Sequence, residues 1–174
     1  MIAGMTTSTK SVRFVELTST AMRALLADDL AAARAETGYE LGDAFLTDAA
    51  KWLWQYRVDQ LDADPTSIGW LVKLVLSEPG VVGYAGFHGP PDAAGMVEIG
   101  YTVDPQYRRQ GYARAIVAAL LELAASKPEV HTVRASISPT NAASLATIAG
   151  FGFLEAGEQW DEEDGLELLF ERAV

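Results

Sequence analysis

Apolar residues recur along this 174-residue chain with two different periods, and the two periods separate strands from helices. Alternation of apolar and polar residues is typical of a half-buried strand, whereas apolar residues spaced three and four positions apart favour a helix. The alternating pattern, bounded by Gly and Pro, predicts strands over residues 11–17, 68–78, 81–89, 96–103, 131–138, 153–161 and 166–174.

The helical pattern occurs in four segments that have recognisable starts or stops. Thr18 or Ser19 is a predicted N-cap for the first, and Asp64–Pro65 ends the second. The four predicted helices cover residues 18–38, 43–64, 111–126 and 141–152. The second is expected to carry Phe45, Ala49, Trp52, Leu53 and Tyr56 on one face. The third is expected to bury Ile116, Val117, Leu120, Leu121 and Ala124.

The order of these elements predicts a mixed α/β (α+β) fold. The order combines hairpins with a single β-α-β crossover from Met96 to Ser138. This crossover requires one parallel strand pair inside a mostly antiparallel sheet. Neither repeats nor linkers divide the chain. We therefore expect a flexible N-terminus over residues 1–10 and one domain over residues 11–174.

Composition narrows the classes of function. A formal net charge of -11 argues against a nucleic-acid partner. The chain has no cysteine, and His88 and His131 lie far apart in sequence, so no metal site is expected. No apolar run approaches the roughly 20 residues that cross a bilayer, and the start lacks a signal-peptide core, so a cytoplasmic protein without membrane contact is predicted. The oligomeric state stays open, and a homodimer is one option.

A turn with arginine and glycine separates the strand at 96–103 from the helix at 111–126. The first turn of a helix has unpaired N–H groups and a positive end, so Arg108, Arg109 and Gly111 would let a phosphate approach the backbone closely. A structural alternative is that Gly111 only makes the turn and the arginines face solvent. The phosphate-loop pattern GxxxxGK[ST] does not occur, and GxGxxG is absent from this turn.

Two motifs on these elements resemble the GNAT superfamily of N-acetyltransferases. The segment "VDPQYRRQGYARAIV" is similar to the acyl-CoA signature [QR]-x-x-G-x-[GA], with Arg108, Gly111 and Ala113 at the defined positions. The second landmark, N-x-x-[SA] followed by G-F, is present at 141–144 and 152–153. The order of elements also matches the family fold. The strand "VEIGYTVDP" and the second landmark are most similar to the branch that includes ribosomal-protein alanine N-acetyltransferases.

The resemblance implies that the parallel strands splay apart to admit the pantetheine arm of acetyl-CoA, a cosubstrate. Backbone groups on the first strand would pair with the pantetheine amides, and N–H groups of residues 109–114 would hold the pyrophosphate. Asn141 would bond the pantetheine from the other side, although it also suits an N-cap. The implied cofactor-binding residues are Tyr101, Val103, Arg108, Arg109, Gln110, Gly111, Tyr112, Ala113, Arg114 and Asn141.

Acetyl transfer to an amine needs a neutral nucleophile, a polarised thioester carbonyl and a stabilised leaving thiolate. The resemblance makes Glu98 the predicted general base, with His88 or a water as alternatives and a plain ion pair as the structural option. The backbone N–H of Val103 is the candidate for the carbonyl. Many relatives carry a tyrosine where this chain has Ile148, which leaves Ser144 as the nearest hydroxyl for the thiolate.

Three functions remain open. The first is an acetyl-CoA-dependent N-acetyltransferase that acts directly on a primary amine of a protein N-terminus or a small molecule. The second is an antibiotic-type or metabolite acetyltransferase, and the third is a non-catalytic acyl-CoA-binding module, which only the missing tyrosine favours. The amine would enter past residues 35–46, near Trp52, Trp54 and Tyr56. The sequence does not identify that amine.

Overall fold

A seven-stranded sheet in the order β1-β2-β3-β4-β5-β7-β6 runs through the computed structural model, which describes residues 10–162 and 165–174. Its strands are β1 (Arg13–Glu16), β2 (Lys73–Ser77), β3 (Gly80–Phe87), β4 (Met96–Val103), β5 (Thr132–Ile137), β6 (Leu154–Asp161) and β7 (Gly165–Ala173). All neighbouring strands are antiparallel except β4 and β5, which are parallel. The predicted mixed sheet is confirmed. The predicted flexible start lies, apart from Lys10, outside the described residues.

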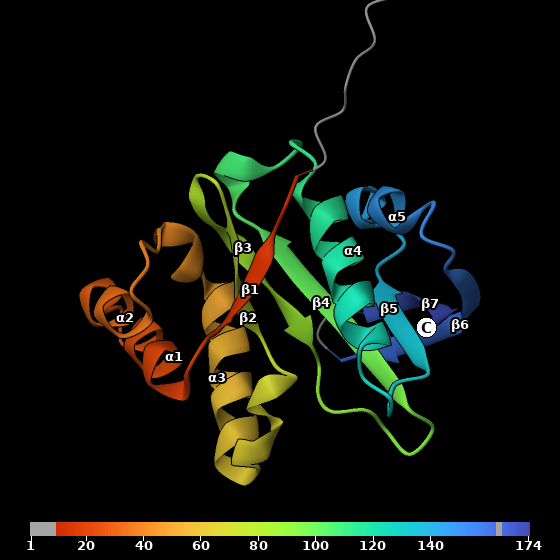
Figure 1. Ribbon diagram of the computed structural model, residues 1–174, viewed down its shortest axis with the longest axis horizontal. Helices are drawn as coiled ribbons and strands as arrows, with labels where there is room; N and C mark the ends of the chain where they lie inside the picture. Colours follow the sequence, from red (N-terminus) through yellow and green to blue (C-terminus); the bar gives the residue numbers. More distant parts are fainter. Residues whose placement is uncertain (1–9, 163–164) are drawn as a thin grey trace, which may run out of the picture.

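Helices cover both faces of this sheet. They are α1 (Ser19–Leu26), α2 (Leu30–Thr37), α3 (Asp48–Ala63), α4 (Tyr112–Ala125) and α5 (Ala142–Ile148), with short 3-10 turns η1 (Asp43–Phe45), η2 (Pro65–Gly69) and η3 (Pro105–Tyr107). Figure 1 shows α1 to α3 beside β1 to β3, and α4 with α5 beside β4 and β5. Side chains alternate along β2, so Leu74 and Leu76 join the core under α1 and α3 while Val75 joins the core under α4.

The parallel pair is joined only at its beginning. Met96 pairs with Thr132, Val97 with Val133 and Glu98 with Arg134, and the pairing ends there. Strand β4 nevertheless continues to Val103 and β5 to Ile137. The two strands therefore diverge beyond Glu98, which leaves one backbone edge of β4 without a strand partner.

The segment predicted as the first helix, residues 18–38, forms two helices instead of one. Asp28 adopts a left-handed φ of 58° after α1. The carboxylate of Asp29 then accepts a hydrogen bond from Ala32 N at 2.9 Å and begins α2. The apolar spacing continues across this break, so periodicity alone does not reveal it, whereas the Asp pair does suit a new cap.

The single apolar face predicted for the second helix is wrong, because Ala49, Trp52 and Tyr56 are exposed, although Phe45 is buried. Helix α3 begins only at Asp48, and it buries Ala50, Trp54, Arg57, Val58 and Leu61. Trp52 and Tyr56 are 50% and 46% exposed. Trp54 fixes this orientation, because its indole N–H donates to Phe45 O at 2.8 Å. By contrast, α4 begins and ends within one residue of the predicted bounds, and it buries all five predicted apolar residues.

Candidate functional site

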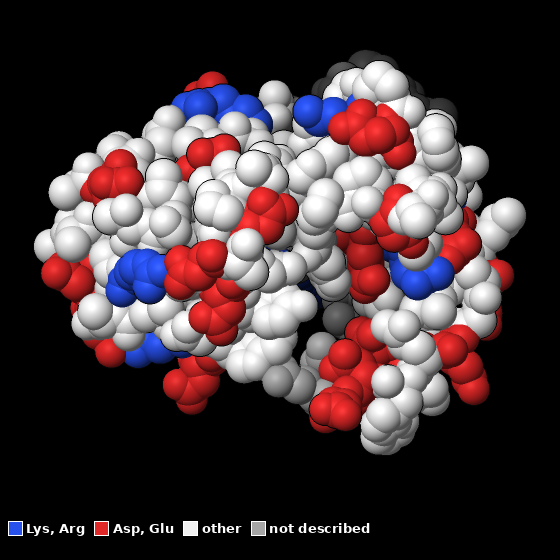
Figure 2. Space-filling view, turned by 90° about the horizontal axis from the view of Figure 1, so that it is seen from below, with Lys and Arg blue, Asp and Glu red and all other residues white. Residues whose placement is uncertain are grey.

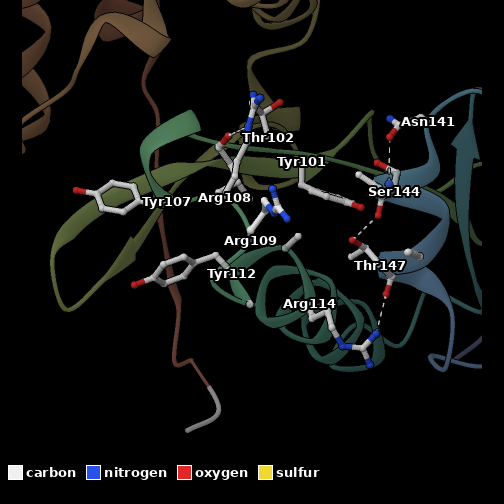
Figure 3. Close-up of a pocket in the computed structure, with 15 residues that line it drawn as sticks. Tyr101, Thr102, Tyr107, Arg108, Arg109, Tyr112, Arg114, Asn141, Ser144 and Thr147 are labelled. Atoms are coloured by element: carbon white, nitrogen blue, oxygen red, sulfur yellow. Dashed lines mark hydrogen bonds between the residues drawn. The ribbon is translucent and has the colours of Figure 1, made fainter. Parts of the chain in front are cut away.

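A pocket of about 820 Å³ lies between the diverging end of β4, the start of α4 and α5 (Figure 3). All but two of the predicted site residues line it, the exceptions being Glu98 and Gln110. The sequence reasoning missed Thr102, Tyr107, Ala143, Ala146 and Thr147. Helical spacing from Ser144 points to Thr147, since residues three apart share a helix face.

The first turn of α4 is the floor of this pocket and has no side-chain cap. Its N-cap residue is Gly111, with a left-handed φ of 88°, and no side-chain hydrogen bond closes the turn. The other α-helices are capped by the side chains of Thr18, Asp29, Thr47 and Asn141. The unpaired N–H groups and positive end of α4 are thus directed at the pocket.

The arginines beside this turn have different environments. Arg108 donates from Nε to Val103 O at 3.0 Å. Arg114 donates to Thr147 O at 3.2 Å and to Ala149 O at 3.1 Å, which ties α4 to the end of α5. Arg109 is exposed, has a left-handed φ of 59°, and has no side-chain partner among the described residues. A left-handed non-glycine residue is strained and often marks a functional turn, and here it holds a guanidinium at the pocket mouth.

The open edge of β4 directs particular backbone groups into the gap. His88 N donates to Glu98 O at 2.8 Å, and Asp104 N donates to Val82 O at 2.9 Å, so these β4 groups point toward β3. Backbone groups alternate sides along a strand. Those of Tyr101 and Val103 therefore point toward β5, where the strands have already separated.

The α5 wall carries Asn141 and Ser144. Asn141 Oδ1 accepts a hydrogen bond from Ser144 N at 3.0 Å, so the capping role anticipated for Asn141 is present. Both residues still line the pocket (Figure 3). Ile148 is 4% exposed in the core and does not line it.

Glu98 lies on the other face of β4, in contact with His88. Glu98 Oε1 is 3.4 Å from His88 Nδ1, and the side chains are 23% and 49% exposed. An ideal Cβ on Gly100 would lie only 2.9 Å from His88 Nε2, so the imidazole uses the space that glycine leaves. Both alternative bases predicted from the sequence thus form one cluster.

Helix α3 holds this cluster in place. His88 O accepts hydrogen bonds from Arg57 Nη1 at 2.9 Å and from Gln60 Nε2 at 3.0 Å. Burial lowers the pKa of Arg57 to about 10, an effect that Tyr56 and Glu98 oppose by favouring the cation. Arg57 is therefore charged at neutral pH and adds positive potential near Glu98.

Two classes of feature are absent from the described ranges 10–162 and 165–174. They contain no group of three or more His, Asp or Glu residues placed to hold a metal ion. Within them, no helix combines the length and apolar character needed to cross a bilayer.

The sequence is similar to one curated relative over part of its length. An uncharacterised N-acetyltransferase of Bacillus subtilis (strain 168), YjdG, is 35% identical over 74 residues. That stretch covers 42% of this chain and 44% of the relative, so less than half of the relative is matched.

Solved structures share the fold at low sequence identity. RimJ of Mycobacterium smegmatis, in complex with CoA-disulfide, has a TM-score of 0.65 and 20% identity over 94% of this chain and 82% of its own. A chimera of the spermidine N-acetyltransferase SpeG from Vibrio cholerae and hSSAT has a TM-score of 0.66 and 12% identity over 94% and 95%. At such identities the likeness supports the fold alone.

A family model covers most of the chain. The model described as the acetyltransferase (GNAT) domain matches residues 13–154, from β1 to the start of β6. This range includes the uncapped turn, the splayed strands and the α5 wall. The uncapped N–H groups and the open β4 edge fit the phosphates and amides of a CoA thioester. The chain therefore belongs to the GNAT family of acetyltransferases.

Proposed function

We propose that this protein transfers an acetyl group directly from acetyl-CoA to a primary amine. The observation that carries the proposal is the position of β4 between two sets of groups. Its open edge and the uncapped α4 turn line one pocket, while the Glu98–His88 pair lies on its other face. An anion site and a carboxylate–imidazole pair on one strand suit a reaction that joins a CoA thioester to an amine.

In this proposal, the N–H groups of residues 109–114 hold the pyrophosphate, together with the Arg109 guanidinium. The dipole contributes only about 0.3–1 kcal/mol, so several N–H bonds and the cation must act together. Backbone groups of Tyr101 and Val103 bond the pantetheine arm, and Asn141 closes the other side. Arg108 and Arg114 act mainly by bracing the pocket walls, because both guanidinium groups donate to backbone carbonyls.

Glu98 is the proposed general base, and His88 is its partner. A lysine-like amine has a pKa near 10.4, so freeing it at pH 7 costs roughly 4–5 kcal/mol, against about 1 kcal/mol for an α-amine near 8. Glu98 would remove the amine proton directly or through a water, and His88 orients the carboxylate at 3.4 Å. A backbone N–H on the open edge of β4 polarises the thioester carbonyl, and Ser144 donates a hydrogen bond toward the leaving sulfur.

The amine is proposed to be cationic in its resting form, either a protein N-terminus or a small-molecule amine. The surface seen from below Figure 1 is hollowed near its centre, and several Asp and Glu side chains lie beside the hollow (Figure 2). The net charge of -11 also attracts a cation. The names of similar proteins include both classes, a ribosomal-protein-S5-alanine acetyltransferase of Vibrio fischeri and a spermidine N-acetyltransferase. We propose that the protein is a cytoplasmic, single-domain enzyme that acts alone or as a homodimer.

Thiol release from acetyl-CoA over a panel of amines tests the proposal. The panel should contain N-terminal peptides, a polyamine, an aminoglycoside and free amino acids, each with a no-enzyme blank. We expect at least one amine to raise release well above the acetyl-CoA hydrolysis rate. If CoA raises the melting temperature but no amine raises release, the protein is an acyl-CoA-binding module instead.

A further inference from the structure

The phenol oxygen of Tyr101 is a buried polar atom without a hydrogen-bond partner. Only Arg57 Nε and Ser136 Oγ share this condition among the side chains of the described ranges. Tyr101 differs from both because it lines the pocket. Figure 3 shows its side chain reaching from β4 toward Ser144 on α5.

An unpaired buried hydroxyl destabilises the folded chain. A bound ligand would supply the hydrogen-bond partner that the chain itself does not provide. Backbone groups of Tyr101 and of its strand neighbours can serve the amides of the pantetheine arm. The phenol is held separately, with its ring packed against the core that contains α4. A donor at this position is preorganised to meet an acceptor that enters the pocket.

The α5 helix does not supply such a donor at the position where many relatives carry tyrosine. Ile148 occupies that position, lies in the core and has no proton to give. Tyr101 approaches the α5 wall from the opposite strand. We propose that the Tyr101 hydroxyl, beside Ser144, donates the hydrogen bond that stabilises the departing CoA sulfur, a proposal that rests on acetyl transfer being the reaction.

The step balances without another reactant. The amine nitrogen forms a bond to the acetyl carbon, the carbon–sulfur bond breaks, and its electron pair stays on sulfur. The phenol O–H donates to that sulfur while the charge develops, and the proton that Glu98 takes from the amine finally returns through water to give the free thiol. Because phenols release protons less readily than thiols, the contribution of Tyr101 is the hydrogen bond rather than a completed transfer.

Tyr101→Phe separates this role from a structural one. Loss of a hydrogen bond to a charged sulfur should lower kcat about 10- to 100-fold. The KM for acetyl-CoA should change by less than about threefold, because the bond forms only as the sulfur becomes charged. The melting temperature without CoA should be equal or higher, since an unpaired buried hydroxyl has been removed.

Ser136→Ala is the matched control, because it removes another unpaired buried hydroxyl, from a β5 residue that does not line the pocket. It should keep kcat within about twofold while leaving stability equal or higher. Equal losses of kcat in both variants would mean that the sheet had changed shape, and the proposal would be wrong. A Tyr101→Phe protein with unchanged kcat and raised KM would make Tyr101 a cofactor-binding residue only.

A titration of bound CoA gives a test that needs no acceptor. Thiolate absorbs in the far ultraviolet, so the pKa of the bound CoA thiol can be followed directly. A donor to sulfur favours the thiolate, and Tyr101→Phe should therefore raise that pKa by about one unit, a tenfold change. If no amine is a substrate but this shift occurs, the acetyl-transfer proposal fails and the Tyr101 contact stands. If the pKa is the same in both proteins, Tyr101 does not contact the sulfur.

Discussion

The two faces of β4 are built in different ways. The pocket on one side comes mainly from two short stretches, residues 101–114 and 141–147. The cluster on the other side joins Glu98 and Gly100 to His88 from the end of β3 and to Arg57 from α3. A cofactor bound mainly through backbone groups can be held by such local geometry. The proposed amine side depends on distant parts of the chain, so its chemistry can vary independently.

Glu98→Gln should cause the largest loss of rate on the proposed amine side of β4, because it removes the proposed base but leaves the pocket intact. We expect the rate to fall about 10²–10⁴-fold at low pH, where general-base help matters most. Raising the pH from about 6 to about 9 should recover part of the loss, because an α-amine with a pKa near 8 becomes neutral in that range. Thiol-release rates across this range measure both effects.

Glu155→Gln, the same change at an exposed position of β6, is its control and should behave as wild type. Acetyl-CoA affinity should be the same in both variants. Parallel pH–rate profiles for wild type and Glu98→Gln, offset by less than about threefold, would remove Glu98 from the mechanism. His88 or a water would then be the base.

Gly111→Asp should impair acetyl-CoA binding in the pocket without changing the Glu98–His88 side of β4. It adds a carboxylate and a Cβ at the uncapped turn, so the rise in melting temperature caused by acetyl-CoA should disappear. Gly38→Asp is a close match, because Gly38 also adopts a left-handed φ, 74° against 88°, at a helix end outside the pocket. Its thermal shift should persist. A folded Gly111→Asp protein with an unchanged shift would place the pyrophosphate elsewhere.

The same division explains which features the sequence could predict. The bounds of β4 match the prediction, and α4 follows it closely, because alternation, the Gly111 turn and a regular apolar stripe are local signals. The acyl-CoA motif likewise led to the pocket residues. The buried face of α3 could not be assigned in this way, since its apolar and aromatic residues surround the helix and only the contact of Trp54 with Phe45 selects one face.

The Glu98 cluster could be predicted only in part. The family resemblance points to Glu98, and the end of the preceding strand points to His88, but the sequence presents the two as alternatives. Their contact depends on the register of β3 with β4, where Phe87 pairs with Ile99 and His88 N bonds to Glu98 O. The role of Arg57 was missed altogether, because a charged residue on a helix normally faces solvent.

Gly100→Ala tests whether the spacing of this cluster matters. The new Cβ would lie 2.9 Å from His88 Nε2, so the imidazole must swing away from Glu98. Because a flexible side chain can move, the fold should survive, and we expect a loss of about tenfold in rate at low pH with little change in acetyl-CoA affinity. Gly69→Ala, where no atom lies within 4 Å of the new Cβ, should leave the rate unchanged. Equal rates in both variants would mean that the 3.4 Å contact is not needed.

Gln60→Met should have the smallest effect, because it removes one of two supports of the same backbone group. The Gln60 amide donates to His88 O at 3.0 Å and accepts from Arg57 Nη1 at 2.6 Å. Methionine preserves the length of the side chain but neither bond, while Arg57 keeps its own bond to His88 O at 2.9 Å. We expect the free energy of unfolding to fall by about 1 kcal/mol and the rate to fall less than about threefold.

Arg57→Met should lower the rate further, because it leaves His88 O with Gln60 alone and removes the buried cation near Glu98. A Gln60→Met loss as large as that of Glu98→Gln would contradict this ranking and make the Gln60 amide a direct contact of the amine.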